Sequence, residues 1–389
     1  MTAQFLINAS NLHVGGGIQV ATSLIDAVAR MSSVSSGLVV WVSDEVDSNL
    51  RKLGCDLTAL PAYEVVDIHG LNLLHSPLQR RLQEFDAVFT IFGPLYVWRL
   101  SGVNITGFAQ PWIIYPDNEI DRAMGWGRRL TTRLKYWVQS LCFRRADRLV
   151  VELDHVRSGL LAKGIGSPTT IDVVRNTLSG VYTSPGSWQP VEVPDAAVDI
   201  KLGFVGRNYS HKNTRIFPAV VDMLQRVHGI KARIYVTFTD EEWAACDESF
   251  CAAVTNVGPL FVAQCPSFYS HMDAVIFPSL LECFSATPLE AMAMKKPLFA
   301  SDRPFNRDVC QAHAHYFDPL SPASAAQAIA AVFAGGGPNE STLQAAHDHA
   351  VHFSSPKERA EKYLALLMQC VQDKKSDSTE DGCSSKKRC

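Results

Sequence analysis

The chain has 389 residues, of which 47% are hydrophobic and 19% are charged, and its formal net charge at pH 7 is −3. This length and composition predict a globular protein of two ordinary domains and exclude a disordered chain. The small negative charge argues against a nucleic-acid-binding protein. No stretch approaches the ~18 apolar residues that a membrane span requires.

The N-terminal sequence and the cysteines indicate the compartment. Residues 1–10 (MTAQFLINAS) have neither the basic leader nor the long apolar run of a secretion signal. The ten cysteines are scattered without a Cys-x-x-Cys pair, which is typical of reduced thiols. We therefore expect a cytoplasmic protein.

The N-terminal half has the pattern of a Rossmann-like domain. A short strand at Gln4–Asn8 leads into a turn with Gly15, Gly16 and Gly17, and a helix pattern covers 18–31. Further strands are predicted at 37–42, 87–92, 104–108 and 149–151. Strands that alternate with helices favour a mostly parallel sheet. The glycine turn does not match Gly-x-Gly-x-x-Gly, which disfavours a dinucleotide site.

Residues 121–148 combine basic and aromatic side chains. The segment contains eight arginines and lysines but only two aspartates. Four aromatic residues lie among them, namely Trp126, Tyr136, Trp137 and Phe143. Such a helix suits the surface of an anionic membrane, where arginines meet the headgroups and rings lie at the interface. The alternative is an ordinary basic helix whose aromatic side chains pack inward.

Changes in composition predict the domain boundaries. The stretch 183–199 begins with many Pro, Ser and Gly residues, so we expect a linker between an N-terminal domain at 1–182 and a C-terminal domain at 200–354. A helix pattern covers 355–372. Residues 373–389 contain no large aliphatic or aromatic residue, which predicts a disordered tail.

A first candidate site follows the strand pattern at Ile200–Val205. The turn GRNYSHKN carries Gly206, Arg207 and Lys212, and a helix pattern follows at 215–227. The glycine permits a tight turn, and the two cations can neutralise the charge of a departing diphosphate. The alternative is a pair of solvated basic residues in a loop.

A second candidate site is the stretch 277–302, FPSLLECFSATPLEAMAMKKPLFASD, in which seven residues separate Glu282 from Glu290. The apolar run 274–278 predicts a buried parallel strand. Glu282 then lies in the loop at the carboxyl end of that strand, where open α/β sheets bind ligands. Thr287 as N-cap and Pro288 at the first helical position predict a helix start.

This second stretch suits a nucleotide-sugar. The amides of residues 285–289 would point from the helix N-terminus into the crevice, where a phosphate can bind. Carboxylates on either side of a diphosphate can accept hydrogen bonds from ribose and hexose hydroxyls. Glu290 alone can also be explained as the capping-box residue of its helix, whereas Glu282 has no structural duty in its loop. No Asp-x-Asp occurs, so we expect no metal.

These two motifs resemble retaining glycosyltransferase family 4. The stretch 277–302 is similar to that family's Glu-x7-Glu signature, and residues 206–213 are similar to its Gly-Arg…Lys-Asn element. The resemblance implies the α/β GT-B fold, in which two Rossmann-like domains with mostly parallel sheets face a central cleft. It also implies a nucleotide-sugar donor, no metal or other cofactor, and a helix at 355–372 that crosses back onto the first domain.

The resemblance assigns roles to individual residues. The implied catalytic residues are Glu282, which contacts the donor sugar, and Arg207 and Lys212, which bind the diphosphate. Glu290 is implied to hold the ribose. Further implied contacts to the nucleotide or donor are Gly206, Gly16, Gly17, Phe284, Ser285, Ala286, Thr287 and Gly258.

The chain departs from the family pattern at several positions. Cys283, Ser285 and Lys295 stand where the family usually has glycine. Gln110 stands at or near the position of a histidine that places the donor sugar, and an amide can hydrogen-bond a sugar but cannot act as a base. We expect Gln110 and Asp117 to position the sugar or the acceptor.

The resemblance implies a metal-independent hexosyltransferase with a lipid-linked or glycan acceptor, as in bacterial O-antigen or capsule biosynthesis. Contact through residues 121–148 would place it peripherally on the cytoplasmic face of the inner membrane. Two alternatives remain open. A nucleotide-sugar epimerase of GT-B fold would consume the donor without an acceptor. A catalytically inactive relative, which Cys283, Ser285 and Gln110 allow, would bind the donor without turnover.

Overall fold

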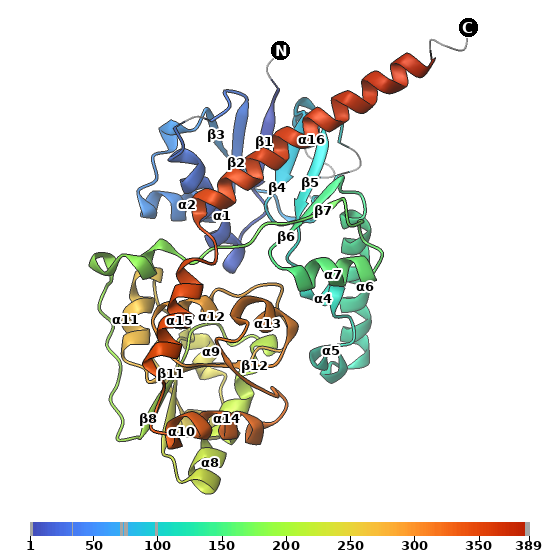
Figure 1. Cartoon of the computed structure of the whole chain (residues 1–389). Helices are drawn as coiled ribbons and strands as arrows, with labels where there is room; N and C mark the ends of the chain where they lie inside the picture. The colour runs from blue at the N-terminus through green and yellow to red at the C-terminus, as the bar shows by residue number, and fades with distance from the viewer. Residues whose placement is uncertain (1–2, 33, 71–72, 74–76, 98–99, 386–389) are drawn as a thin grey trace. The chain divides into compact units, whose positions relative to one another are not determined.

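The computed structural model describes residues 3–32, 34–70, 73, 77–97 and 100–385, and the chain forms two compact domains (Figure 1). The N-terminal domain comprises Met1–Ile114, Leu130–Asn176 and Ser354–Cys389. The C-terminal domain comprises Tyr115–Arg129 and Thr177–Phe353. The segment Tyr115–Arg129, which we expected in the N-terminal domain, thus packs with the C-terminal one.

The N-terminal domain is built on a parallel sheet whose seven described strands have the order β3-β2-β1-β4-β5-β6-β7. They are β1 (Phe5–Ala9), β2 (Leu38–Val42), β3 (Ala62–Val65), β4 (Ala87–Thr90), β5 (Val103–Gly107), β6 (Arg148–Val151) and β7 (Ile171–Val173). β1 is buried along its whole length, as its apolar sequence FLINA predicts for a parallel strand covered on both faces.

Helices cover both faces of this sheet. In the described residues they are α1 (Gly16–Ala29), α2 (Asp44–Leu53), α3 (Leu78–Arg81), α4 (Pro111–Ile114), α7 (Asp154–Ala162) and α16 (Pro356–Ser385), with 3-10 turns η1 (Leu57–Ala59) and η3 (Leu82–Glu84). The helix α6 (Trp126–Phe143) begins in the segment that packs with the C-terminal domain and ends in the N-terminal domain. α1 begins two residues before the expected start, with Gly15 as its N-cap.

The long helix α16 packs beside α1 on the N-terminal domain (Figure 1). Tyr363, Leu366 and Leu367 are buried there among residues of the sheet. The helix continues to Ser385, whereas we expected it to end at 372 and to be followed by a disordered tail. Residues 373–385 contain no proline that would end it, and the rest of the expected tail, 386–389, lies outside the described residues.

The C-terminal domain is built on a second parallel sheet with the order β10-β9-β8-β11-β12-β13. Its strands are β8 (Ile200–Phe204), β9 (Ala232–Val236), β10 (Val254–Asn256), β11 (Ala274–Phe277), β12 (Leu298–Ser301) and β13 (His315–Phe317). The strand order reverses between β8 and β11, so the loops that follow these two strands lie side by side. Such a reversal is where ligands bind in open α/β sheets.

Short helices surround this second sheet. The described ones are α5 (Glu119–Ala123), α8 (Phe217–His228), α9 (Asp240–Ala244), α10 (Glu248–Ala253), α11 (Cys265–Ser270), α12 (Thr287–Ala293), α13 (Pro304–Cys310), α14 (Pro322–Ala334) and α15 (Glu340–Val351). The 3-10 turns are η4 (Gly180–Thr183), η5 (Pro185–Ser187), η6 (Ser210–Lys212), η7 (Thr214–Ile216) and η8 (Val262–Gln264). The helix expected at 215–227 is therefore a 3-10 turn followed by α8.

An aromatic cluster holds the end of β8 in place. The ring of Phe204, the last residue of β8, lies 5.5 Å from Phe217 and 6.3 Å from Phe238, measured between centroids. Phe250 lies 6.1 Å from Phe238 on the other side of the cluster. All four are buried, so the loop that leaves β8 starts from a well-packed core.

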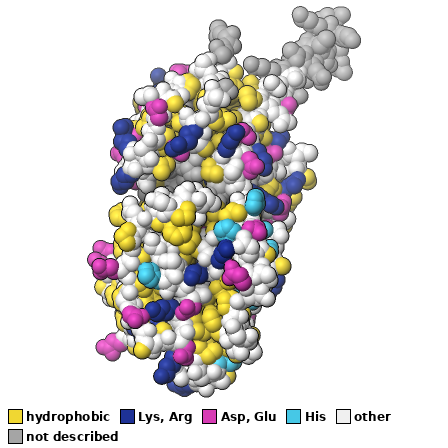
Figure 2. Space-filling model, turned by 60° about the vertical axis from the view of Figure 1, so that its left-hand side comes forward, with side chains coloured by type: hydrophobic (Ala, Val, Ile, Leu, Met, Phe, Trp, Pro, Cys, Tyr) yellow, Lys and Arg dark blue, Asp and Glu magenta, His cyan; other side chains and the backbone are white. Residues whose placement is uncertain are grey.

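None of the helices in the described part of the chain is long and apolar enough to cross a membrane. On the face drawn in Figure 2, lysine and arginine side chains are interspersed with acidic ones. No single basic patch gathers on that face, in keeping with the net charge of −3.

Candidate functional site

The two sequence motifs meet at the strand reversal of the C-terminal sheet. The loop after β8 and the loop after β11 are joined by a hydrogen bond of 2.8 Å from Leu280 N to His211 O. Next to this bond, Lys212 Nζ lies 2.7 Å from Glu282 Oε1. The two side chains are only 14% and 12% exposed, so water screens their attraction less than it would on the surface. A cation and a carboxylate from separate motifs therefore form one site.

The ammonium group of Lys212 has two further neighbours. It lies 5.1 Å from the centroid of the Phe277 ring, at the end of β11. Its charge also lowers the pKa of Glu290, so it acts on both carboxylates of the Glu-x7-Glu pair. Lys212 is thus placed to hold an anion that binds between them.

His211 also faces Glu282, although the sequence analysis assigned it no role. Its Nε2 lies 3.8 Å from Glu282 Oε1. Burial lowers the pKa of His211, which outweighs the opposite effect of the Glu282 charge. The imidazole is therefore neutral at pH 7 and adds no second positive charge to the site.

Glu290 does not cap its helix. α12 starts at Thr287, its N-cap is Ala286, and no side chain bonds to the cap. The expected N-cap, Thr287, is instead the first helical residue, and its hydroxyl donates to Val205 O at 3.4 Å. The Glu290 carboxylate accepts a 2.9 Å hydrogen bond from the Tyr269 hydroxyl. The capping-box explanation of Glu290 is therefore wrong.

Burial and neighbouring side chains shift the pKa of the Glu290 carboxylate in opposite directions. Burial raises its pKa and is the largest effect, so the net pKa lies above the ordinary value although Tyr269, Tyr182 and Lys212 lower it. Tyr182 comes from η4, just after the chain enters the C-terminal domain, and its ring lies 6.2 Å from that of Tyr269. These polar neighbours favour an ionised carboxylate, which is the form that accepts hydrogen bonds from sugar hydroxyls.

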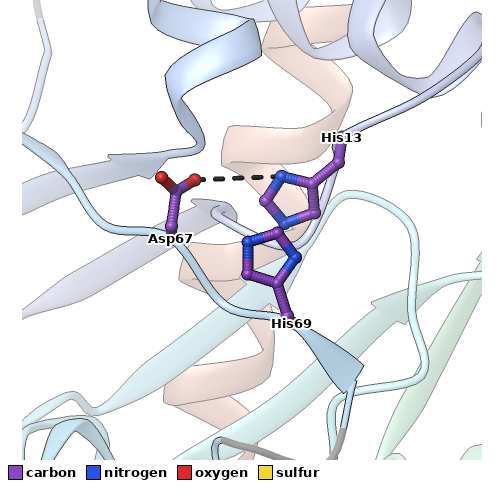
Figure 3. A group of neighbouring side chains, drawn as sticks. All are labelled: His13, Asp67 and His69. Atoms are coloured by element: carbon purple, nitrogen blue, oxygen red, sulfur yellow. Dashed lines mark ion pairs between the residues drawn. The ribbon is translucent and has the colours of Figure 1, made fainter.

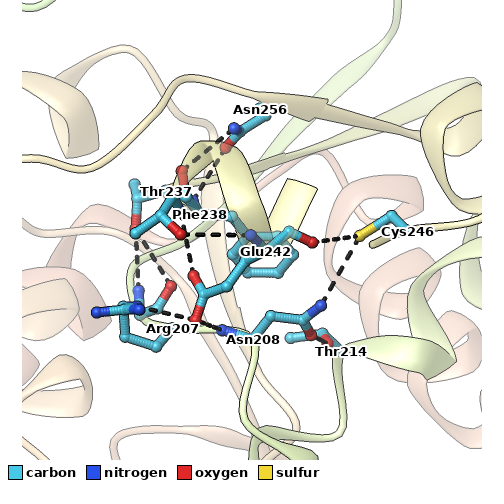
Figure 4. A network of polar contacts seen from close by, with 10 residues as sticks. Arg207, Asn208, Thr214, Thr237, Phe238, Glu242, Cys246 and Asn256 are labelled. Atoms are coloured by element: carbon cyan, nitrogen blue, oxygen red, sulfur yellow. Dashed lines mark hydrogen bonds and ion pairs between the residues drawn. The ribbon is translucent and has the colours of Figure 1, made fainter. Parts of the chain in front are cut away.

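Arg207 lies at the more exposed side of the same loop and belongs to a polar network (Figure 4). Its Nε donates to Glu242 Oε1 at 2.8 Å, and Asn208 N donates to the same oxygen at 3.2 Å. Glu242 is itself fixed by a capping box with Thr239 at the start of α9. The sequence analysis did not identify Glu242, because nothing in its local pattern distinguishes it from an ordinary first-turn glutamate. The network holds the loop of Arg207 against β9 and α9.

Two glycines in the site have backbone conformations that other residues rarely adopt. Gly206 has φ 154, and a Cβ at this position would lie 3.2 Å from the Phe204 ring. Gly258 has φ 89, in the left-handed region, and its N donates to Asn256 Oδ1 at 3.2 Å. A side chain at either position would be strained, so both turns depend on the glycine backbone.

The segment between Glu282 and α12 presents free backbone donors. In the described structure, the N–H groups of Phe284, Ser285 and Ala286 donate no hydrogen bond. These amides stand directly before the start of α12. They are available to an anion. The sequence analysis gave this role to the amides of residues 285–289, and the role stays a prediction.

The remaining predicted residues lie elsewhere. Gly16 and Gly17 form the first turn of α1, and a Cβ on Gly17 would lie 3.3 Å from the Leu12 side chain. Gln110 follows β5 and precedes α4, and its side chain is half-buried. Asp117 is 68% exposed and lies 3.8 Å from Arg129 Nη2. A role of these residues toward donor or acceptor stays a prediction.

A group of two histidines and an aspartate lies in the N-terminal domain (Figure 3). His13 Nδ1 lies 2.9 Å from Glu45 Oε2 and 3.8 Å from Asp67 Oδ1, and its Nε2 lies 3.0 Å from Ile68 O. The His13 ring stacks on His69 at 3.9 Å. Because both nitrogens of His13 face oxygen acceptors, they suit a protonated ring rather than a metal ligand.

The electrostatics of His13 agree with a protonated ring. Burial lowers its pKa, but the Ile68 carbonyl and the Glu45 carboxylate outweigh burial, and the net pKa is raised. Stacked rings also cannot direct their in-plane lone pairs at one ion. We therefore assign no metal to this group, which the sequence analysis did not identify.

Comparison with known proteins gives a family match and a fold. Residues 199–335 match the family profile described as Glycosyl transferases group 1. This segment contains Arg207, Lys212, Glu282 and Glu290. No curated protein sequence matches the chain.

Several solved structures are similar to the whole chain. Anabaena HepE in complex with UDP and glucose has 14% identity and a TM-score of 0.68, over 94% of this chain and 100% of that one. A glycosyltransferase from Rickettsia africae has 14% identity and a TM-score of 0.67, over 95% and 99%. WaaG, a glycosyltransferase involved in lipopolysaccharide biosynthesis, has 12% identity and a TM-score of 0.61, over 93% and 99%.

These likenesses establish the GT-B fold, with two α/β domains on parallel sheets of seven and six described strands. The predicted fold class is therefore confirmed. The group 1 match over residues 199–335 supports a glycosyltransferase enzyme.

Proposed function

We propose that this protein is a retaining glycosyltransferase of family 4 type, which moves a hexose from a nucleotide-sugar to an acceptor hydroxyl. The observation that carries the proposal is the position of Lys212, 2.7 Å from Glu282 and within electrostatic reach of Glu290, at the strand reversal of the C-terminal sheet. Retention of the anomeric configuration is proposed from the resemblance of the Glu-x7-Glu stretch alone.

In this proposal the leaving diphosphate binds to Lys212, Arg207 and the free amides of residues 284–286. The bond between the anomeric carbon and the phosphate oxygen breaks, and negative charge builds on that oxygen. The acceptor oxygen forms the new bond to the anomeric carbon, and its hydroxyl proton passes to the departing diphosphate. Lys212 is nearly buried and can stabilise this charge strongly. Arg207 uses Nε for Glu242, so its two terminal nitrogens can contact a phosphate.

The two carboxylates accept hydrogen bonds from hydroxyl groups of the donor. Glu290, held by Tyr269, would accept from the ribose, and Glu282 would accept from the sugar. Anabaena HepE is described in complex with UDP and glucose, which supports a nucleotide-sugar as the donor class. The positive charges of Lys212 and Arg207 can do the work of a divalent metal, so we propose that none is needed.

We further propose a lipid-linked acceptor and peripheral contact with the cytoplasmic face of a membrane. α6 exposes an apolar stripe with spacings of four, four, three and four residues, formed by Trp126, Leu130, Leu134, Trp137 and Leu141. Its opposite face packs inward, with Phe143 buried and Tyr136 stacked on Trp112 at 5.7 Å.

The charges beside this stripe fit an anionic lipid surface. Arg128, Arg133 and Lys135 are exposed on α6. At 3.6 residues per turn Arg133 lies beside the apolar stripe, whereas Arg128 and Lys135 lie farther round the helix. An apolar stripe with basic flanks is typical of helices that lie in a membrane interface. WaaG is described as acting in lipopolysaccharide biosynthesis, which supports an acceptor of the surface-polysaccharide class, such as O-antigen or capsule.

The proposal is tested by the release of nucleoside diphosphate from a panel of UDP-, GDP-, dTDP- and ADP-sugars, with and without a bacterial lipid extract. Release from one donor that rises with the extract is the expected result. Conversion of the donor to an isomer without release would indicate the epimerase. Binding without release or conversion would indicate the inactive relative, and both of these outcomes would contradict the transferase.

A further inference from the structure

Tyr269 is a fully buried tyrosine whose hydroxyl reaches the candidate site. It lies on α11, outside both motif loops, and its ring is 0% exposed. The hydroxyl donates to Glu290 Oε2 at 2.9 Å. A phenylalanine could fill the same space in the core, so packing alone does not account for the hydroxyl.

The groups around the Glu290 carboxylate come from three elements. Tyr269 and Cys265 face it from α11, Tyr182 faces it from η4, and Lys212 faces it from η6. Burial raises the pKa of Glu290, and Tyr269 has the largest of the effects that lower it. The hydrogen bond from Tyr269 therefore stabilises the ionised carboxylate, and it opposes burial, which keeps the net pKa of Glu290 above its ordinary value.

We propose that Tyr269 is a positioning residue for the nucleotide, acting through Glu290. Its hydrogen bond fixes Oε2 and leaves the other carboxylate oxygen to accept from ribose hydroxyls. The inference deepens the proposed function and rests on it for the identity of the ligand. The contact between the two side chains belongs to the ligand-free protein and can be tested without any ligand.

Replacement of Tyr269 by phenylalanine removes the hydroxyl and keeps the ring. Without this donor the carboxylate of Glu290 holds its proton to a higher pH. A neutral carboxyl group is a poor acceptor for ribose hydroxyls, so nucleotide binding should be lost at a higher pH as the solution is acidified.

The first experiment follows the titration of Glu290 in the ligand-free protein by carbon-13 NMR of the side-chain carboxyl groups. Glu290→Gln assigns the signal. Tyr235→Phe is the matched control, because Tyr235 is also 0% exposed and its hydroxyl has no hydrogen-bond partner among the described residues. We expect the midpoint to rise by about one pH unit in Tyr269→Phe and to stay unchanged in the control. An unchanged midpoint in Tyr269→Phe overturns the proposal.

The second experiment measures the dissociation constants of UDP, GDP, dTDP and ADP between pH 5 and 8. For the nucleotide that binds the wild type, we expect Tyr269→Phe to bind it about tenfold more weakly near neutral pH. As the pH is lowered, the variant should lose binding at a higher pH than the wild type does. Binding equal to wild type at every pH overturns the positioning role. A wild type that binds none of the four contradicts the proposed function, and the NMR titration still decides whether Tyr269 controls Glu290.

Discussion

Lys212 Nζ lies 2.7 Å from Glu282 Oε1, and this ion pair joins the loop after β8 to the loop after β11. The two residues are 70 positions apart in the sequence, and the parallel pairing of β8 with β11 brings their loops together. A buried carboxylate needs a partner charge, and a phosphate needs a cation. Lys212 can neutralise the charge of Glu282 in the ligand-free protein, and it can bind the phosphate when a donor is present.

The two ends of the proposed donor site should respond differently to mutation. Glu290→Ala removes the acceptor for the ribose and should weaken nucleotide binding about tenfold or more. Arg207→Ala removes charge that acts on the leaving group and should mainly lower kcat. Nucleotide titration and steady-state kinetics of both variants measure this difference. Wild-type binding and turnover in both would contradict the site assignment.

Both motifs and their cations and carboxylates could be predicted from the sequence, because each follows an apolar strand directly. Glycine turns and strand ends are local features, and the α/β architecture follows from their alternation. The match of residues 199–335 to a glycosyltransferase family falls on this same region.

Other parts of the site depend on contacts between distant residues. The hydrogen bond from Tyr269 to Glu290 joins two helices. The segment Tyr115–Arg129 packs with the C-terminal domain, although the residues before and after it in the sequence belong to the N-terminal domain. Arg303 of the C-terminal domain holds that segment through a 2.6 Å bond to Glu119. No local pattern encodes such pairings, so the sequence could not predict them.

The second prediction concerns lipid binding by α6. Trp126 and Trp137 are 82% and 59% exposed, and the double change Trp126→Ser, Trp137→Ser removes both rings from the apolar stripe. We expect at least tenfold weaker binding to vesicles that contain phosphatidylglycerol, because each buried ring contributes to partitioning. Co-sedimentation measures the binding.

The control for α6 is Phe261→Ser, which removes an aromatic ring that is 74% exposed on the C-terminal domain. It should bind the vesicles as the wild type does. The membrane proposal is contradicted if the tryptophan variant keeps wild-type binding, or if vesicles of phosphatidylcholine alone bind equally well, since the basic flanks would then have no effect.

The third prediction concerns a buried glutamate in the N-terminal domain. Glu152 follows β6, and burial raises its pKa to about 7, against the opposing effects of Arg359 and Asn176. Between the unfolded pKa of 4.5 and about 7 the folded protein keeps a proton that the unfolded chain has lost. The free energy of unfolding should therefore fall by about 3 kcal/mol from this group as the pH rises through that window.

Glu152→Gln removes this titration. Urea unfolding of wild type and variant at pH 5 and pH 8 measures the effect, and the variant should lose less stability over this range than the wild type. Arg359, which is 1% exposed and bonded to Asn176, remains in both proteins. Equal changes of stability in the two proteins would show that Glu152 has the same charge folded and unfolded.

The fourth prediction follows from the backbone of Lys295, which has φ 52 just after α12. Residues with a Cβ are disfavoured in the left-handed region of backbone conformation. Glycosyltransferase family 4, which this stretch resembles, usually has glycine here. Among the described residues the one ion pair of Lys295 is a 3.8 Å contact with the exposed Glu340, which contributes little. Lys295→Gly should therefore raise the free energy of unfolding by about 1 kcal/mol.

The reciprocal variant provides the control for Lys295. Gly229 has φ 71 at the end of α8, and a Cβ there would meet no atom within 4 Å. Gly229→Lys should therefore lower stability by a similar amount through backbone strain alone. If Lys295→Gly were destabilising while Gly229→Lys behaved as expected, the Lys295 side chain would have a stabilising contact that outweighs the strain.

We propose above that Lys212 stabilises a departing nucleoside diphosphate, and the decisive measurement is release of that product by wild type and Lys212→Met. The exposed Lys231 supplies the control variant, Lys231→Met. With the donor that the wild type uses, we expect turnover about 100-fold lower in Lys212→Met and unchanged in the control. Turnover by a folded Lys212→Met protein at the wild-type rate would contradict it.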